Sequence, residues 1–475
     1  MSFIVIWIFF FFLGGELLCL FLNPNYFFLV FSGVSSLFVS FIFYKRRKLF
    51  LSDFFILLLF FFLGALWFKP YNLKVSSPFL KEKVKVIGKI IEAPFYYSNY
   101  ALYKIRSNHI SLNGKQIYFP GSILVKDYSL KKVSVFDVYM FEGNLRKNFY
   151  KRRGYILYLK KDKPAFKVRV TKDIRKIPFL VSEKISWIFK ESFPKPISTF
   201  ILAIFLGKRE EYFPQIKKIF VEAGTCHILA ISGLHIGIIS AVFLFILKFI
   251  GFKKRSRLFL ALPLVLFYAF LSGARPPVLR AAFMFLIYSL SIILKRKFLL
   301  FNSLALAGLG DLFFRPDDFL TIGFQFSFLA VFSIAIGFKY FYSPKKLTFL
   351  EKARILFLTS LFANLGLTGI ISFYFGKIYL LSLLINILVI PYLGLIFYSL
   401  FVFLTFFFIE PLGKFVVLSC SFIIWLFLRI NQFFSNLPWS YLNYKASLGE
   451  VFLYYVFFLV ILLLVDLRKK RKILS

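Results

Sequence analysis

Long runs of apolar residues without a charge dominate this sequence and restrict what it can fold into. A bilayer core is crossed by a helix of about 20 such residues, and runs close to this length recur along the chain. Phe alone accounts for 72 of the 475 residues, so apolar side chains greatly exceed what a water-soluble core could bury. The sequence therefore predicts a polytopic α-helical membrane protein with about 12 spans.

The apolar runs fall into a group before residue 70 and a longer group after residue 225. One run, 377–409, is too long for a single straight span and contains Pro391, so a kink, a break or two helices are expected there. The expected spans are 3–22, 27–44, 53–68, 226–250, 257–272, 277–294, 298–314, 319–338, 355–373, 377–409, 412–430 and 450–466.

Basic clusters predict how these spans are oriented, because loops rich in Lys and Arg stay in the cytoplasm. The clusters at Lys45–Lys48, 253–257, 295–297, 345–354 and 468–472 fall on one side if the amino terminus is cytoplasmic. Both termini are then expected inside. The first run has neither a basic start nor a small-residue cleavage site, so we expect it to be retained as a span.

Between residues 71 and 176 the pattern changes to short alternating runs, such as Val84, Val86 and Ile90 with lysines between them. Turn dipeptides at Asn113-Gly114 and Pro120-Gly121 separate these runs. This pattern predicts an inserted β domain outside the cytoplasm, for which an OB-type barrel is the expected fold.

The predicted barrel is strongly basic, in a chain whose net charge is +40. Much of that charge serves topology and contact with anionic lipids. A basic domain outside the cytoplasm nevertheless departs from the positive-inside bias, and it indicates a polyanionic partner. Single-stranded nucleic acid is bound by interleaved aromatic and basic side chains, although a strand with one buried face gives the same alternation. The candidate DNA-binding residues in the barrel are Tyr103, Lys104, Arg106, Tyr150, Lys151, Arg152 and Arg153, whereas His109 is expected on the surface or in a turn.

Residues 177–222 predict amphipathic or re-entrant helices that do not cross the membrane. The apolar run from Phe200 to Leu206 is too short to span, and it ends in a charged turn that contains Lys208 and Arg209. These two side chains are further candidates for contact with DNA. The alternative is an interfacial helix whose lysines reach water.

The stretch from Gly224 to Gly237 places His227 and His235, two of the three histidines, inside an apolar run. A charged side chain at mid-span costs about 2.5 to 3.5 kcal/mol, so polar residues there pair or line a cavity. Ser232-Gly233 lies between the histidines and favours an interrupted helix that lines a pathway.

Three more polar groups interrupt the second half of the chain. Arg275, Pro276 and Arg280 combine arginines with a helix start, which suits an anion, or else Arg275 simply reaches the interface. Gln325 and Ser327 enter an apolar span, where a structural hydrogen bond between helices is the alternative reading. Asn386 and Pro391 can open a helix around a cavity.

Enzyme chemistry is less favoured than transport. An intramembrane hydrolase could use Ser232 with His235 three residues later, but no oxyanion arrangement is evident. His227 and His235 are about 80° apart on an ideal helix and have no third ligand nearby in sequence. Cys19, Cys226 and Cys420 form no close pair, and no GxxxxGK[ST] loop occurs. We therefore expect a transport channel without a catalytic site, a metal or a cofactor.

The ordered set GTCHILAISGLHIG, preceded by LGKREEYFPQIKKIFVEAG and followed by SGARPPVLRAA and GFQFSFLAV, resembles the signature of the ComEC family of competence proteins. The resemblance covers residues 197–391, and the amino-terminal spans and basic barrel fit the family's layout. It implies an inner-membrane channel that passes single-stranded transforming DNA into the cytoplasm. The pathway residues that it implies are His227, Ser232, Gly233, His235, Arg275, Pro276, Arg280, Gly323, Gln325 and Ser327, to which our own reading adds Asn386 and Pro391.

The resemblance also implies partners and a domain order. Many family members carry a metallo-β-lactamase-like domain, but no HxHxDH motif occurs here, so a separate nuclease is expected. The other expected partners are single-stranded DNA, membrane lipids, a periplasmic or surface DNA receptor and a cytoplasmic helicase. A transporter of another polyanion or of a lipid-linked polymer is the strongest rival. The expected domains are 1–70 (spans), 71–176 (OB-like barrel), 177–222 (amphipathic or re-entrant helices), 223–467 (channel bundle) and 468–475 (basic tail).

Overall fold

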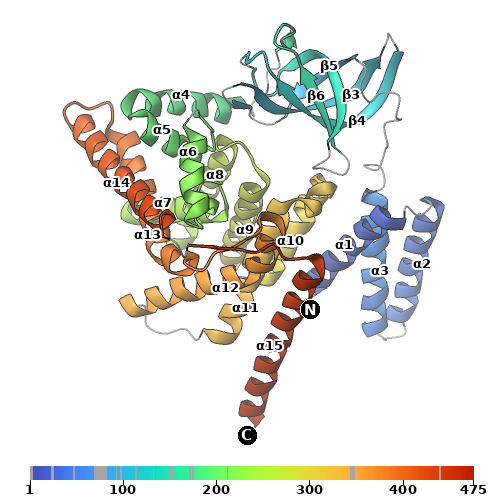
Figure 1. Cartoon of the computed structure of the whole chain (residues 1–475). Helices are drawn as coiled ribbons and strands as arrows, with labels where there is room; N and C mark the ends of the chain where they lie inside the picture. Colours follow the sequence, from blue (N-terminus) through green and yellow to red (C-terminus); the bar gives the residue numbers. More distant parts are fainter. Residues whose placement is uncertain are drawn as a thin grey trace. The chain divides into compact units, whose positions relative to one another are not determined.

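The structure, a computed structural model, combines a small β-barrel with two groups of helices (Figure 1). It divides into two compact units. The first unit comprises Met1–Trp187, Lys208–Glu211 and Leu262–Phe319, and the second comprises the remainder. The residues described are 4–22, 26–45, 49–68, 83–91, 94–96, 99–112, 115–131, 133–148, 154–170, 173, 176–210, 212–342, 348–437 and 440–474.

The first unit begins with three apolar helices, α1 (Ile4–Leu22), α2 (Tyr26–Lys45) and α3 (Leu49–Phe68). Helices α1 and α3 touch through backbone, because glycines occupy their crossing. A Cβ atom added at Gly15 would lie 1.7 Å from the Phe61 carbonyl oxygen, and one at Gly64 would lie 2.1 Å from that of Phe12. Such close approach through small residues is typical of helix pairs in membranes.

The remaining helices of the first unit include α9 (Pro276–Ile293) and α10 (Leu300–Phe314), which pack against each other. Helix α1 also packs against α10. The first unit is therefore assembled from segments about 280 residues apart in sequence, a separation that can be followed in the blue and yellow helices of Figure 1.

The barrel closes through five strands in the order β1-β3-β4-β6-β5-β1, because β1 pairs with both β3 and β5. Strands β4 and β6 are parallel, and the other pairs are antiparallel. This is the Greek-key connectivity of an OB-type barrel, as the sequence predicts. The strands are β1 (Lys83–Ile90), β2 (Phe95–Tyr96), β3 (Ala101–Leu112), β4 (Lys115–Asp127), β5 (Val138–Asn148), β6 (Gly154–Leu159) and β7 (Phe166–Arg169).

Alternate residues of these strands fill the barrel core, among them Val84, Ile105, Val125 and Phe141. One predicted turn is wrong, since Pro120 and Gly121 lie within strand β4. The ladder between β3 and β4 shifts register between Ser107 and His109, opposite these residues. A bulge tolerates a proline that cannot donate to the ladder. His109 is exposed in strand β3 and not in a turn.

The amphipathic helix α4 (Ile177–Ser192) follows the barrel, and the helices of the second unit follow it. The apolar run at Phe200 forms no span: it is buried in α5 (Lys195–Ile201) and the π-helical segment η4 (Leu202–Leu206). The later helices are α6 (Phe213–Glu222), α7 (Gly233–Phe249), α8 (Lys254–Leu271), α11 (Ile322–Phe341), α12 (Phe349–Phe375), α13 (Ser382–Phe406), α14 (Leu412–Ser435) and α15 (Leu448–Leu474), with the short strands β8 (Lys377–Ile378) and β9 (Leu442–Asn443) pairing before α15. Helix α8 continues from the second unit into the first.

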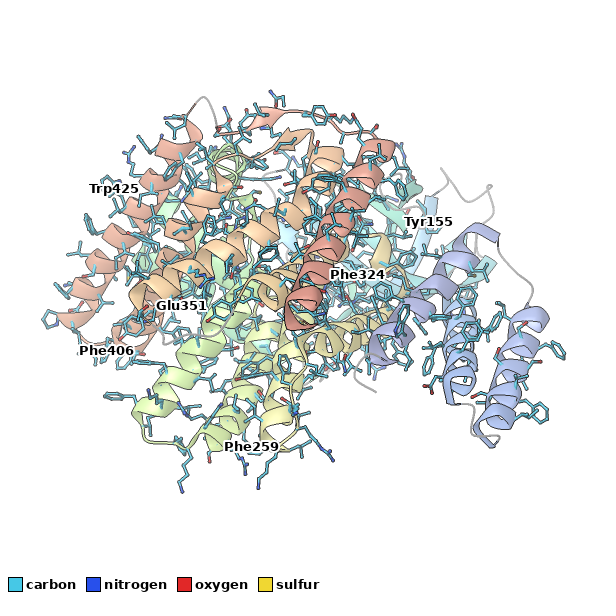
Figure 2. The ribbon with its side chains drawn as sticks, turned by 90° about the horizontal axis from the view of Figure 1, so that it is seen from below. Tyr155, Phe259, Phe324, Glu351, Phe406 and Trp425 are labelled. Carbon is cyan, nitrogen blue, oxygen red and sulfur yellow. The ribbon has the colours of Figure 1, made fainter. Side chains whose placement is uncertain are left out.

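Among the described residues, five helices are long and apolar enough to cross a membrane, namely α9, α11, α12, α13 and α14. Exposed aromatic side chains line the outside of several helices, as Phe259, Phe406 and Trp425 illustrate (Figure 2). The chain is thus a helical membrane protein with a barrel domain, whereas the expected count of about 12 spans is not confirmed.

The α1–α3 crossing predicts a sharp difference between two glycines. Gly64→Ala should lower the stability of the protein by about 1–3 kcal/mol, because the added methyl group overlaps the Phe12 backbone. Gly33→Ala in α2 is the matched control, since its methyl group would lie an ordinary 3.6 Å from Phe62. Thermal unfolding of the purified protein in detergent measures both. Equal stability of the two variants would contradict the backbone contact.

Candidate functional site

A break between helices α6 and α7 forms the first candidate site, and it lies in the second unit. Helix α6 ends at Glu222, and Gly224 then adopts a left-handed conformation with φ of 75°. A Cβ atom at Gly224 would lie 2.9 Å from the Tyr379 ring and 3.3 Å from the Ser382 side chain, so only glycine fits. The chain passes through one 3-10 turn, η5 (Cys226–Ile228), before α7 begins. The expected interruption of the helix is present.

Side chains from other helices satisfy polar groups at this break. Thr225 is fully buried, and its hydroxyl donates to the Asn431 Oδ1 atom of α14 at 2.7 Å. The Asn431 Nδ2 atom in turn donates to the Phe427 carbonyl at 2.9 Å. Helices α6, α13 and α14 lie close together in Figure 1, and both α6 and α13 contact α14. Asn431 is fully buried, but nothing in the sequence distinguishes it from amides that face the surface, so the sequence does not predict its role.

Ser232 and His235 form a reciprocal cap at the start of α7. The His235 Nδ1 atom accepts a hydrogen bond from the Ser232 backbone N–H at 3.2 Å, and it lies 3.2 Å from the Ser232 hydroxyl. His235 is fully buried and meets the Phe397 ring edge to face. This geometry gives His235 a structural role at a helix start, because capping satisfies backbone donors that would otherwise lie bare in an apolar bundle. His227, in contrast, is exposed within the 3-10 turn, and Gly233 is exposed at the first position of α7.

A polar seam joins helices α12 and α13 beside the break. The Ser382 hydroxyl donates to the Asn364 Oδ1 atom at 2.8 Å, and the Asn364 Nδ2 atom donates to the Ser360 carbonyl at 2.9 Å. Asn386 follows one turn after Ser382 and is buried, and its Oδ1 atom accepts no hydrogen bond from the described residues. We call Thr225, Asn431, Ser382, Asn364 and Asn386 the polar centre of the second unit.

The other predicted residues of this unit are more dispersed. Pro391 lies inside the continuous helix α13, which begins at Ser382 after strand β8, so the expected long span is one helix with an internal proline. The Gln325 Oε1 atom accepts from the Tyr374 hydroxyl at 3.0 Å, which links α11 to α12. Gly323 is exposed and Ser327 half-buried on α11. The structural reading of Gln325 as an interhelical hydrogen bond is thus realised.

Arg280 belongs to the first unit, where it forms a buried ion pair. Its Nη1 atom lies 2.6 Å from the Asp311 Oδ2 atom, and the two side chains are 4% and 8% exposed. The pair joins α9 to α10. A buried arginine neutralised in this way does not offer a free charge to a phosphate. Arg275 caps α9 in extended conformation and Pro276 is its first residue, as the sequence predicts.

A cluster on the outer face of the barrel carries the aromatic and basic side chains that suit nucleic acid. The Lys126 ammonium lies 4.2 Å from the centre of the Tyr100 ring and 5.1 Å from that of Tyr128. Lys126 is the register partner of Tyr158 across β4 and β6, and the Arg146 guanidinium lies 5.4 Å from the Tyr158 ring. We call Tyr100, Lys126, Tyr128, Arg146 and Tyr158 the tyrosine cluster.

Electrostatics keep the centre of the tyrosine cluster positive. The hydrogen bond with the Tyr128 hydroxyl raises the pKa of Lys126 above its ordinary value, and the neighbouring Tyr100 and Tyr158 hydroxyls add to this. Lys126 therefore remains an ammonium throughout the neutral range. A cation among three half-exposed rings can pair with phosphate while the rings stack on bases.

The DNA-binding residues predicted from the sequence differ in how exposed they are in the structure. Tyr103 is 2% exposed and donates to Asp127 at 2.9 Å, so its ring is part of the barrel core and cannot stack on a base. Lys104 and Arg106 of the same strand point outward, so for these two residues the predicted outer face is correct. Lys208 is held by Glu183 of α4 at 2.8 Å, and Arg209 is half-exposed beside it. Tyr150, Lys151, Arg152 and Arg153 lie outside the described residues.

No group of three His, Cys, Asp or Glu side chains gathers to hold a metal within the described ranges. Cys19 and Cys420 are buried and Cys226 is half-buried, and all three are free thiols. The sites available are therefore the polar centre of the second unit, the Arg280–Asp311 pair and the tyrosine cluster.

Comparison with known proteins identifies the family. Residues 204–468 match the sequence profile of the family described as "Competence protein", which is more than half of the chain. The chain belongs to the competence protein family. The matched residues run from the buried segment η4 through the helix break to the last helix.

Three relatives support the assignment. The chain is 32% identical to "ComE operon protein 3" of Bacillus subtilis over 205 residues, which is 43% of this chain and 26% of that protein. It is 34% identical over 143 residues to an "Uncharacterized protein" of Aquifex aeolicus, covering 30% of this chain and 33% of the relative. It is 34% identical over 100 residues to "Uncharacterized protein YcaI" of Escherichia coli, covering 18% of this chain and 12% of the relative. The matches thus span a third or less of each relative's length. No solved structure matches.

The ion pair in the first unit predicts a folding defect that a second substitution repairs. Arg280→Ala should cost about 3–5 kcal/mol of stability, because it leaves the Asp311 carboxylate buried and unpaired. Arg280→Met with Asp311→Leu should recover most of this loss, and Arg296→Ala, at an exposed arginine after α9, is the control. Thermal unfolding in detergent reports all three. An Arg280→Ala protein as stable as the control would contradict a structural role for the pair.

Proposed function

We propose that this chain forms the membrane path through which single-stranded DNA enters the cytoplasm during transformation. Membership of the competence family supports a role in DNA uptake. The apolar helices of the second unit supply the membrane-embedded part, and the barrel supplies a surface that collects the strand. Within this proposal the protein is a channel of the plasma membrane with both termini in the cytoplasm, and it performs no covalent chemistry.

The tyrosine cluster is the observation that carries the choice of DNA over other polyanions. Arginines and lysines alone suit any phosphate chain, including a lipid-linked polymer. Half-exposed rings around Lys126 add stacking, which is worth about 1–3 kcal/mol per base and has no counterpart in a base-free polymer. Lys104 and Arg106 extend the positive charge along strand β3, which neighbours β4.

The polar centre supports a conducting role for the second unit. A helix break within an apolar bundle, lined by Thr225, Asn431 and Asn386, resembles the broken helices that line substrate paths in transporters. His227 and Gly233 lie on the exposed side of the same break. The Ser232–His235 pair could serve a hydrolase, but the His235 Nδ1 atom already accepts a hydrogen bond from the backbone, so the transport reading is preferred.

In this proposal, partner proteins supply the energy for DNA entry and produce the single strand. The sequence contains no GxxxxGK[ST] loop, so we propose a cytoplasmic helicase that pulls the strand, a separate nuclease that produces it, and a surface or periplasmic receptor that delivers duplex DNA.

The tyrosine cluster gives a binding prediction for the full-length protein in lipid nanodiscs. Tyr158→Ala should weaken binding of a single-stranded oligonucleotide by about 1–3 kcal/mol and leave binding of inorganic polyphosphate unchanged, because only bases stack. Lys126→Gln should weaken binding of both ligands. It should also reduce the slope of log binding constant against log salt concentration by about 0.7. Lys161→Gln, at an exposed lysine before strand β7, is the matched control. Equal losses for both ligands in Tyr158→Ala would favour a transporter of another polyanion.

Uptake of labelled DNA by cells that lack the gene tests the function itself. We expect labelled DNA that is protected from added nuclease to accumulate outside the cytoplasm, while no label enters the cytoplasm. Complementation with the Arg280→Met, Asp311→Leu protein then separates folding from transport, since a folded protein that restores no entry would show that the guanidinium itself is needed. Normal entry in the deletion strain would refute the channel proposal, provided that no paralogue substitutes.

A further inference from the structure

The last strand of the barrel exposes a row of apolar side chains that the DNA-binding role does not use. Phe166 and Val168 of β7 are 63% and 52% exposed, and Val170 just beyond the strand is exposed as well. Register extends this row across the barrel, because Phe166 pairs with Met140 of β5 and Met140 pairs with Ile87 of β1. Ile87 is exposed and Met140 is half-buried on the same outer face. We call these five residues the apolar stripe.

Helix α4 exposes a second apolar surface shortly after the stripe. Leu180 and Trp187 are 65% and 63% exposed, and Ile177 lies one turn before Leu180 on the same face. Lys184 is exposed between them, and Lys190 follows in the last turn. Aliphatic residues, a tryptophan and lysines on one helix face are typical of helices that lie in the interface of a bilayer.

Contacts at the junction hold the stripe and the helix in a fixed relation. The buried Asp137 carboxylate pairs with both Lys167 of β7, at 2.8 Å, and Lys176 immediately before α4. The Phe136 ring meets the Phe179 ring of α4 edge to face with centres 5.6 Å apart. Lys89 of β1 adds an ion pair with Asp173 at 3.0 Å. The apolar stripe and the start of α4 therefore move as one body.

We propose that the apolar stripe and the exposed face of α4 form one docking surface that seats the barrel on an anionic lipid bilayer. The chain enters the barrel from the apolar helix α3, which ends at Phe68, and leaves it into the amphipathic helix α4. Arg169 and Lys184 are exposed beside the apolar side chains, and cations beside an apolar surface complement anionic head groups. The inference concerns the lipid surface alone and does not rest on the DNA-channel proposal.

Docking at this surface would fix the height of the tyrosine cluster. Met140 and Arg146 lie six residues apart on strand β5, which is about 20 Å at the rise of a strand. The stripe meets lipid at the first of these residues, and the tyrosine cluster begins at the second. The rings and cations would then stand in water clear of the head groups.

Depth-dependent fluorescence quenching of the full-length protein in nanodiscs tests the proposal. A bimane label is attached at Val168→Cys in the stripe, with Val170→Cys as a second position if the first disturbs folding. Ser122→Cys, exposed on strand β4, is the matched control, and the protein without an added cysteine reports labelling of Cys226. Lipids that carry a nitroxide quench from the bilayer, and iodide quenches from water.

The expected result is strong quenching by nitroxide lipids at 168, little at 122, and the reverse for iodide. Replacing anionic lipid with zwitterionic lipid, or introducing Lys184→Gln, should reduce the lipid quenching at 168. Iodide quenching at 168 equal to that at 122 would overturn the proposal, because the stripe would then face water. Protection at 168 from both quenchers would also overturn it, since another part of the chain or a second copy would cover the stripe.

Discussion

Polar groups inside an apolar bundle, on the backbone or on side chains, must find hydrogen-bond partners within the protein, because lipid offers none. The break between α6 and α7 obeys this constraint through two devices. Thr225 reaches Asn431 on α14, and Ser232 and His235 cap the next helix against each other. The close fit of Gly224 against Tyr379 and Ser382 brings α13 to the same place. The interruption that suits a transport path is therefore also what connects four helices of the second unit.

The arginines of the first unit show a different solution to the same constraint. Arg280 is buried with Asp311, so its charge is cancelled where it would be most costly. Arg275 occupies the N-cap position of α9, where the chain emerges from a left-handed turn at Gly273 and Ala274. A charge that looks like part of a conducting path in the sequence can thus serve to join two helices, and only the partner side chain distinguishes the two roles.

Much of the fold can be predicted from the periodicity of apolar residues, whereas the hydrogen-bond and ion-pair partners of individual side chains cannot. Uncharged runs predicted the positions of most helices, and alternation predicted a barrel whose strand order is that of an OB-type domain. Alternation cannot say which face of a strand is buried, which is why Tyr103 was expected on the surface and lies in the core. The interruption after Gly224 was predicted from Ser232-Gly233, but Asn431, Asn364 and Asp311 were not, because each meets its partner across a distance that sequence spacing does not encode. Tyr100, Tyr128 and Tyr158 likewise come together only when strand β4 pairs with both β3 and β6.

The interleaving of the two units has a consequence for the order in which the chain can mature during synthesis. Helix α1 rests on α10, so the first unit is not complete until about residue 314 has left the ribosome. By then the segments 188–207 and 212–261 have been made, but their partners α11 to α14 have not. Helix α6, the helix break and α7 are therefore synthesised well before α14, which completes their contacts. During that interval the buried Thr225 hydroxyl has no Asn431 to meet, so this hydrogen bond forms only after α14 has been made.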